Sequence, residues 1–264
     1  NGLYLRSSWP GYHRSFARRI HVIGNYAYVA NWSAGLEVID ISDPAHPTLT
    51  GSVKTYCRAV DVHVSGDYAY VADDYGGLEV IDISDPVHPT RTGSLSSIGG
   101  AGSVHVSGNY AYLGGNGLKV VDISDPAYPK LTGSFGNTGV AGVCVRGNKA
   151  YIGDGANGFK VIDVSDPAHP TLTASLNVFS FACKVDVSGN YAYVGDWYAG
   201  IKVVDISDPA HPTLTSSLPV GNVEDLHVSG NYAYVAAYYG GLKVVNISNP
   251  AHPMRGTDLN SQPG

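Results

Sequence analysis

The stretch from Gly35 to Pro47 reads Gly-Leu-Glu-Val-Ile-Asp-Ile-Ser-Asp-Pro-Ala-His-Pro, and with its lightly changed copies it occurs six times. The copies begin at Gly77, Gly117, Gly158, Gly200 and Gly241. A second marker, Gly-Asn-Tyr-Ala-Tyr-Val, first occurs at Gly24 and returns at steps of 42, 42, 39, 42 and 41 residues. Repeats at a fixed period specify a whole architecture, so they constrain the fold before any other feature does.

Each repeat predicts four short strands, and the second repeat shows them clearly. Residues 60–64 alternate apolar and polar side chains, and residues 68–71 are aromatic and β-branched. Residues 78–83 form a nearly continuous apolar run, which is typical of a strand covered on both faces. Residues 90–95 are rich in Thr and carry few large apolar side chains, which favours an outer, exposed strand. An Asp-Pro-Val-His-Pro segment between the last two runs predicts a turn.

Four strands in a repeat of about 40–45 residues are typical of one blade of a β-propeller. We therefore predict an all-β fold, a six-bladed β-propeller with four antiparallel strands per blade. No apolar stripe of helical period persists along the chain. At 264 residues, all repeats can share one ring, so we expect a single domain over residues 1–264. Within it, residues 1–16 precede the repeats, residues 17–253 contain them, and residues 254–264 form a tail.

The closure of the ring leaves two alternatives. Residues 3–8 resemble the Thr- and Ser-rich pattern of the fourth strand, whereas residues 254–258 match it poorly. We predict that residues 3–8 form the outermost strand of the sixth blade, beside residues 242–248, so that strand exchange between the termini closes the ring. In the alternative, residues 254–259 fill that place, and the N-terminal strand is free to add to a neighbouring molecule. The closing residues of the first alternative are Leu3, Tyr4 and Leu5.

Composition and charge exclude several classes of protein. Charged residues are only 14% of the chain, below the roughly 25% of an ordinary soluble domain. A formal charge of −6 argues against nucleic acid as a partner, because such a surface needs clustered Lys and Arg. No apolar run approaches the roughly 18 residues of a membrane span. Cys57, Cys144 and Cys183 do not form a disulfide framework, and Cys144 is interpreted as a small buried side chain.

The residues from Leu36 to Pro44, Leu-Glu-Val-Ile-Asp-Ile-Ser-Asp-Pro, resemble the LVIVD repeat, a family named for such a strand. The last copy, Leu242 to Pro250, departs most, because Asn replaces both aspartates. The resemblance covers nearly all of residues 17–253. It implies a β-propeller of a bacterial or archaeal protein that is secreted or displayed on the cell surface. The family carries no shared catalytic motif, so the resemblance implies no reaction.

Two positions of the innermost strand carry polar residues in most repeats. The first position holds possible metal ligands, and the second varies in charge. Side chains of an inner strand point between blades, and the ring is too wide for one ion to reach several of them. We therefore predict no metal site and no cofactor, and expect these residues to pair with backbone groups or with neighbouring blades. The first set is His21, His63, His105, Cys144, Asp186 and His227, and the second is Arg19, Asp61, Ser103, Gly142, Lys184 and Asp225.

Two more repeated residues lie outside the inner strand. An Asp ends the third run, and a His lies in the following turn; both recur too regularly to be unique catalytic groups. We expect the Asp to serve the structure of each blade, and the His residues to offer a repetitive contact surface on a rim. The Asp residues are Asp40, Asp82, Asp122, Asp163 and Asp205, and the His residues are His46, His88, His169, His211 and His252.

A ligand-binding face is predicted where the loops between second and third strands meet the loops that lead into the inner strands. This face combines aromatic rings with carboxylates and guanidinium groups. Rings and carboxylates suit sugars, whereas Tyr, Trp and Arg are the usual anchors of protein interfaces. Packing over the blade ends is the alternative interpretation. The predicted face comprises Tyr12, Arg14, Trp32, Tyr56, Arg58, Asp74, Asp196, Trp197, Tyr198, Tyr238 and Tyr239.

Enzymatic motifs are missing from the sequence. It has no Gly-x-Ser-x-Gly elbow, no His-Glu-x-x-His and no phosphate-binding Gly-Lys-Ser/Thr, so we predict no catalytic residues. A carboxylate pair such as Asp74 with Asp196 suits a glycosidase in principle, but nothing in the spacing selects it. We expect a non-enzymatic, extracellular or cell-surface module that contacts a protein partner or copies of itself, including assembly through a donated terminal strand. The alternatives are a carbohydrate-binding propeller for a surface glycan and, less favoured, a glycan hydrolase.

Overall fold

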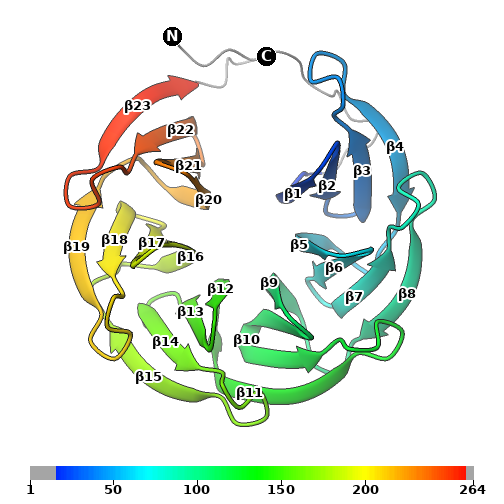
Figure 1. Cartoon of the computed structure of the whole chain (residues 1–264), viewed down its shortest axis with the longest axis horizontal. Helices are drawn as coiled ribbons and strands as arrows, with labels where there is room; N and C mark the ends of the chain where they lie inside the picture. Colours follow the sequence, from blue (N-terminus) through cyan, green and yellow to red (C-terminus); the bar gives the residue numbers. More distant parts are fainter. Residues whose placement is uncertain (1–15, 260–264) are drawn as a thin grey trace. The chain divides into compact units, whose positions relative to one another are not determined.

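The computed structural model describes residues 16–259, and all regular secondary structure among them is β-strand. These residues form six antiparallel sheets, three in each of two compact units. The first unit extends to Thr138, and the second begins at Gly139. In each unit the first strands of consecutive sheets lie on the inside and the last strands on the outside (Figure 1).

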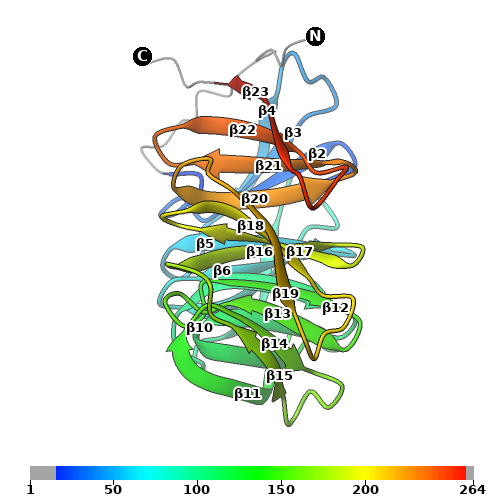
Figure 2. The same ribbon diagram turned by 90° about the vertical axis from the view of Figure 1, so that its left-hand side faces the viewer.

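Strands follow one another in sequence order within every sheet. Figure 2 shows this order for the last sheet, from β20 to β23. The first unit contains β1 (Arg19–Ile23), β2 (Tyr26–Ala30), β3 (Leu36–Asp40), β4 (Thr48–Val53), β5 (Ala59–Ser65), β6 (Tyr68–Asp73), β7 (Gly77–Asp82), β8 (Thr90–Leu95), β9 (Ala101–Ser107), β10 (Tyr110–Asp122) and β11 (Lys130–Gly139). The second contains β12 (Gly142–Arg146), β13 (Lys149–Gly153), β14 (Phe159–Asp163), β15 (Thr171–Leu176), β16 (Ala182–Ser188), β17 (Tyr191–Asp196), β18 (Gly200–Asp205), β19 (Thr213–Leu218), β20 (Val223–Ser229), β21 (Tyr232–Ala237), β22 (Gly241–Asn246) and β23 (Met254–Leu259).

The third sheet differs in one respect, because β10 runs without a break through the positions of the second and third strands. Its residues 110–115 pair with β9, and its residues 118–122 correspond to the third strand of other blades. The connection is shorter here: ten positions separate Tyr68 from Leu78 in the second blade, but only eight separate Tyr110 from Leu118. The prediction of an all-β, six-bladed propeller with four antiparallel strands per blade is confirmed.

The core lies between neighbouring blades of a unit. One cluster joins Leu36 and Val38 of the first blade to Val62, Val71 and Ile81 of the second. Third strands are buried on both faces, as their continuous apolar runs predict, whereas fourth strands are mostly half-exposed or exposed. Each fully buried Leu, Ile or Val side chain contributes about 1.5–3 kcal/mol relative to an exposed one.

The outermost strand of the sixth blade corrects one prediction. β23 pairs with β22, with Leu242 opposite Leu259 and Asn246 opposite Met254. The prediction that residues 3–8 lie beside residues 242–248 is therefore wrong, and the alternative assignment of residues 254–259 to that place is the observed one. An edge strand pairs through its backbone, so it needs no Thr-rich pattern, and a short connection favours the local partner. The predicted closing residues Leu3, Tyr4 and Leu5 lie outside the described residues.

No helix that is long and apolar enough to cross a membrane occurs between residues 16 and 259.

Candidate functional site

The predicted face depends on contacts between two kinds of loop, and backbone hydrogen bonds join them in both units. In the first unit, Trp32 and Ala59 exchange two N–H···O bonds of 3.0 Å, which link the first blade to the second. Within the second blade, the Asp74 N–H donates to the Arg58 carbonyl at 3.0 Å. In the second unit, the Trp197 N–H donates to the Phe181 carbonyl at 3.0 Å. These bonds fix the loops as one surface in each unit.

Buried carboxylates accept hydrogen bonds from the backbone of the same loops. Asp196 is fully buried, and it accepts hydrogen bonds from the Ser180 N–H at 2.8 Å, the Phe181 N–H at 3.1 Å and Lys202 Nζ at 2.8 Å. Burial raises its pKa, but the Lys202 ammonium and the backbone N–H groups outweigh burial and hold the pKa of Asp196 below its usual range. Asp73 accepts from the Cys57 and Arg58 N–H groups in the same way.

Asp196 was predicted on the binding face, but its carboxylate faces the protein interior and organises the loop. The glycosidase-like pair of Asp74 and Asp196 therefore lacks one accessible carboxylate. The same repeat position holds Asp73 and Asp154, and this recurrence was the sequence signal of a structural role; the direction of the side chain follows from the loop N–H groups that surround it.

The first cluster of the face, called here the Trp32 cluster, consists of Arg18, Trp32, Arg58, Asp74 and Tyr75. The guanidinium carbons of Arg18 and Arg58 lie over the Trp32 ring, 5.5 Å and 5.0 Å from its centroid. Arg58 also lies 5.6 Å from the centroid of the Tyr75 ring, and its NH1 is 3.5 Å from Asp74 Oδ2. Three predicted residues, Trp32, Arg58 and Asp74, thus come together, and Arg18 joins them.

Arg18 was not among the predicted face residues. It directly precedes β1, at a position where the corresponding residues of other repeats include Val60 and Cys183. The sixth repeat also has a charged residue there, Glu224, so the sequence pattern did not single out Arg18. Tyr56, which was predicted, is exposed nearby in sequence, and no ring contact joins it to the cluster among residues 16–259.

The second cluster, called the Tyr238 cluster, consists of Trp197, Glu224, Tyr238 and Tyr239, and Tyr198 follows Trp197 in the same loop. The Trp197 and Tyr238 ring centroids are 5.8 Å apart, and those of Tyr238 and Tyr239 are 4.3 Å apart in an edge-on arrangement. A side-chain hydrogen bond with Tyr239, together with the negative charges nearby, raises the pKa of Tyr238. Tyr198 is 70% exposed and Tyr239 is 91% exposed, so both rings are open to a ligand.

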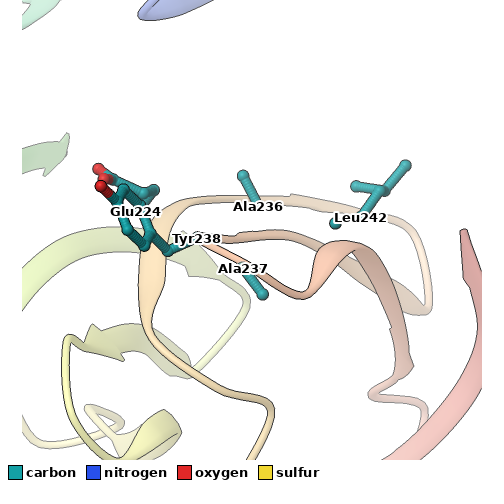
Figure 3. A pocket seen from close by; sticks show the side chains of 6 residues that line it. Glu224, Ala236, Ala237, Tyr238 and Leu242 are labelled. Carbon is teal, nitrogen blue, oxygen red and sulfur yellow. The ribbon is translucent and has the colours of Figure 1, made fainter. Parts of the chain in front are cut away.

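A pocket of about 230 Å³ lies beside the Tyr238 cluster (Figure 3). Glu224 and Tyr238 lie together at one end of it in this view, and Leu242 lies at the other end. The lining is otherwise small and apolar, from Ala236, Ala237 and Gly241. A carboxylate and a phenol beside an apolar floor can accept hydroxyl hydrogen bonds while covering an apolar surface.

Tyr12 and Arg14, the remaining predicted residues of the face, lie outside the described part of the chain.

Comparison with known proteins places the repeats in a family. A family model described as the LVIVD repeat matches residues 16–55, 58–96, 98–137, 139–178, 181–219 and 220–255. The chain belongs to the LVIVD repeat family. No curated protein matches this LVIVD-repeat chain in sequence.

Solved structures share the fold of the LVIVD-repeat chain at low sequence identity. The β-propeller domain of Cps50 (Swd1) from Myceliophthora thermophila is 12% identical with a TM-score of 0.76, over 94% of this chain and 87% of that one. A candidate 6-phosphogluconolactonase from Bacteroides uniformis is 12% identical with a TM-score of 0.77, over 92% and 86% of the two chains. The computationally designed Ika8 protein is 12% identical with a TM-score of 0.64, over 94% and 90%. At this identity the likeness establishes the fold alone.

The repeated aspartates of the LVIVD strands serve the blades, as predicted. The Asp40 and Asp205 carboxylates accept from the N–H groups of Ser42 and Ser207, each at 2.8 Å. These bonds close Asx turns at the strand ends. The Ser207 side chain and then the Ser207 N–H, both hydrogen-bonded to Asp205, hold the pKa of Asp205 below its usual range. In the following turn, His46 Nδ1 lies 2.7 Å from Asp43 Oδ2, and the same exposed pair recurs in other repeats.

Inner-strand residues of the LVIVD repeats pair between blades, also as predicted. The His63 ring lies 4.7 Å from the rings of both His21 and His105, centroid to centroid. His21 Nδ1 accepts a hydrogen bond from the Val64 N–H at 3.2 Å. Burial, with the charges of the flanking histidines, lowers the pKa of His63 to about 3. Between residues 16 and 259, no group of three or more His, Cys, Asp or Glu side chains is arranged to hold a metal ion.

Proposed function

We propose that this LVIVD-repeat propeller is a non-enzymatic contact module of the cell surface or the extracellular space, which binds a protein partner or copies of itself through its loop face. The observation that supports the proposal is the gathering of exposed Trp, Tyr and Arg side chains on loops. Such residues dominate the binding energy of protein interfaces, because they bury large areas with few rotatable bonds. Tyr56, Tyr75, Tyr198 and Tyr239 are 76%, 68%, 70% and 91% exposed, and the last three occupy the same loop position in the second, fifth and sixth repeats.

Rigidity of the loops favours the same role. Trp32, Arg58, Trp197 and Tyr238 all lie on segments whose backbone is bonded to a neighbouring loop or blade. Asp73 and Asp196 add hydrogen bonds beneath these segments. Binding then costs less conformational entropy, since the contact residues are already positioned.

A concentration series by sedimentation velocity tests association with copies of the chain. If copies associate through the loop face, the wild-type protein forms larger species as concentration rises, and the Trp32→Ala and Tyr239→Ala proteins form fewer. A chain that lacks residues 1–8 separates assembly through a donated strand from assembly through the loops, because only the former requires those residues.

Cross-linking to proteins of the native secreted or surface fraction, followed by binding measurements on the purified candidate, tests a foreign partner. The proposal requires that Trp32→Ala or Tyr239→Ala weaken partner binding at least about tenfold, the usual effect of losing an interface hot spot. Partner binding or self-association that survives both substitutions would contradict the proposed use of this face.

The pocket beside Glu224 and Tyr238 favours carbohydrate binding as a second candidate. A sugar ring can cover the exposed face of Tyr239 or Tyr238 while its hydroxyls donate to the Glu224 carboxylate. A glycan array of neutral oligosaccharides tests this function, with Glu224→Gln as the matched variant. Binding that is lost in this variant and kept in Trp32→Ala assigns sugar recognition to the Tyr238 cluster; no binding on the array contradicts it.

A further inference from the structure

The backbone at Trp32 adopts a conformation that suits glycine. Trp32 has a φ of 41°, and it is the only non-glycine residue between residues 16 and 259 with a positive φ. The corresponding residue of the fourth blade is Gly155, with a φ of 54°. Both residues form the same isolated antiparallel bridge to the next blade, Trp32 with Ala59 and Gly155 with Ala182. The bridge therefore needs no side chain, and the bulky indole is held in a strained conformation.

The indole organises two cations. Arg18 and Arg58 both lie over its ring, and Arg58 also contacts the Tyr75 ring. Stacking orients a planar guanidinium and leaves its N–H edges free to donate to a further group. These arginines are not features of the repeat: in the fifth blade, Cys183 and Phe181 occupy the two corresponding positions.

The charge of the Trp32 cluster is not balanced. Asp74 is the one carboxylate paired with it among the described residues, at 3.5 Å from Arg58 NH1. No described carboxylate forms an ion pair with the Arg18 guanidinium. The cluster thus carries a net positive charge on a chain whose formal charge is −6. Its complement is a carboxylate, which a guanidinium edge binds through two parallel N–H···O bonds.

We propose that the Trp32 cluster binds the side-chain carboxylates of an acidic segment of a partner protein, with Arg18 as the principal donor and Trp32 as the residue that positions both arginines. This inference rests on the proposed contact function and names the chemistry of its partner. A protein segment is favoured over an acidic sugar because the guanidinium groups lie over the indole, where a sugar ring would otherwise stack. Tyr75 then offers an exposed ring to the apolar side chains beside the carboxylates.

The test uses a fluorescein-labelled peptide of alternating Glu and Leu, with the matched Gln and Leu peptide as a neutral control, in fluorescence anisotropy. The Glu peptide should bind the whole chain, and its binding should weaken as the salt concentration rises. The Gln peptide should not bind. Equal binding of both peptides overturns the proposal. A labelled oligogalacturonate is the third probe, and tighter binding of this acidic sugar than of the Glu peptide also overturns it.

Three variants connect the binding to the cluster. Arg18→Gln and Trp32→Gly should each weaken binding of the Glu peptide at least about fivefold. Lys130→Gln, which removes one positive charge from an exposed position of the same unit, should leave it unchanged. If Lys130→Gln weakens binding as much as Arg18→Gln does, only the net charge matters, and the site is refuted.

Trp32→Gly also distinguishes a binding role from a structural one. Because glycine suits the φ of this position, the variant should have an unchanged or higher melting temperature but should no longer bind the Glu peptide tightly. A melting temperature that falls by several degrees shows that the indole stabilises the fold, and it overturns the positioning role.

The proposed contact function fails separately from this inference. If a native partner binds through Tyr239 while the Glu peptide does not bind, only the inference about the Trp32 cluster is wrong. If neither Trp32→Ala nor Tyr239→Ala affects self-association or partner binding, the contact function itself is wrong.

Discussion

Arg19 donates from Nε to Asp61 Oδ1 at 3.0 Å, from the innermost strand of the first blade to that of the second. Asp61 is buried, and its Oδ2 accepts the Val104 N–H of the third blade at 3.0 Å. One carboxylate therefore bonds to the inner strands of three consecutive blades.

Substitution of Asp61 should loosen the first unit. Asp61→Ala removes the acceptor of the Val104 N–H and one buried partner of the Arg19 guanidinium, and we expect the free energy of unfolding to fall by about 2–4 kcal/mol. Urea denaturation measures the change. Asp67→Ala, in an exposed turn of the same blade, is the control and should change it by less than about 0.5 kcal/mol. Equal effects would show that the link between blades contributes little.

His63 should make the fold sensitive to acid. Its pKa is about 3 in the folded chain, where burial and the neighbouring His105 and His21 disfavour the imidazolium, against about 6.5 when unfolded. The unfolded chain therefore binds a proton that the folded chain does not, so stability is complete above about pH 6.5 and falls with pH below that value. The expected loss is about 2 kcal/mol between pH 7 and pH 5.

The His63→Asn variant lacks the imidazole that binds this proton in the unfolded chain. Its urea midpoint should therefore depend less steeply on pH than that of the wild type between pH 7 and pH 5. Parallel pH profiles for the two proteins would contradict the assignment to His63.

Asp196 and Asp74 provide a matched pair, because both were predicted on the binding face, whereas Asp196 is buried and Asp74 is half-exposed. Asp196→Ala removes the acceptor of two loop N–H groups and of Lys202, and should cost about 3–5 kcal/mol of stability. Asp74→Ala breaks a half-exposed ion pair with Arg58 and should cost less than about 1 kcal/mol. Thermal denaturation distinguishes them.

The Asp74→Ala protein should also bind the Glu peptide more tightly, since it loses the carboxylate that competes for Arg58. Weaker binding in this variant would mean that Asp74 itself contributes to the contact.

Two glycines that recur in the repeats should respond differently to substitution. Gly77 has a φ of 79°, and a Cβ placed there would lie 2.3 Å from the Leu95 carbonyl oxygen, so Gly77→Ala should cost at least about 2 kcal/mol. Gly66 has a φ of 59° with open space around the Cβ position, so Gly66→Asn meets backbone strain but no clash and should cost about 1 kcal/mol, less than Gly77→Ala. Chemical denaturation of both variants checks the difference, and comparable losses would show that φ, not space, controls both sites.

Strand positions were predictable because each repeat alternates or clusters its apolar residues. Residues 60–64 were predicted as a strand, and β5 extends them by one residue at each end. β23 was predicted only as the alternative outer strand, because such a strand bonds through its backbone and the side chains of Met254 and Arg255 gave no signal.

The candidate site was less predictable than the fold. Trp32 and Arg58 are distinctive loop residues in the sequence, but their contact arises from a bridge between blades. Arg18 is recognisable as a member of the Trp32 cluster only from the structure, by the position of its guanidinium over the Trp32 ring. Asp196 illustrates the opposite error, because a loop aspartate can face a ligand or the backbone, and only the positions of the surrounding N–H groups decide which.

Hydrogen bonds between neighbouring inner strands join residues 40 to 43 positions apart, as from Arg19 to Asp61, Val104 to Asp61, Val228 to Asp186 and Cys183 to Val223. Each blade thus finds its neighbour one repeat further along the chain. The blades can therefore fold in the order of synthesis, each new blade covering the exposed face of the one before it. Interactions between neighbouring blades then make folding cooperative. Within either unit, a mutation should therefore destabilise mainly the blade that carries it and the blades next to it.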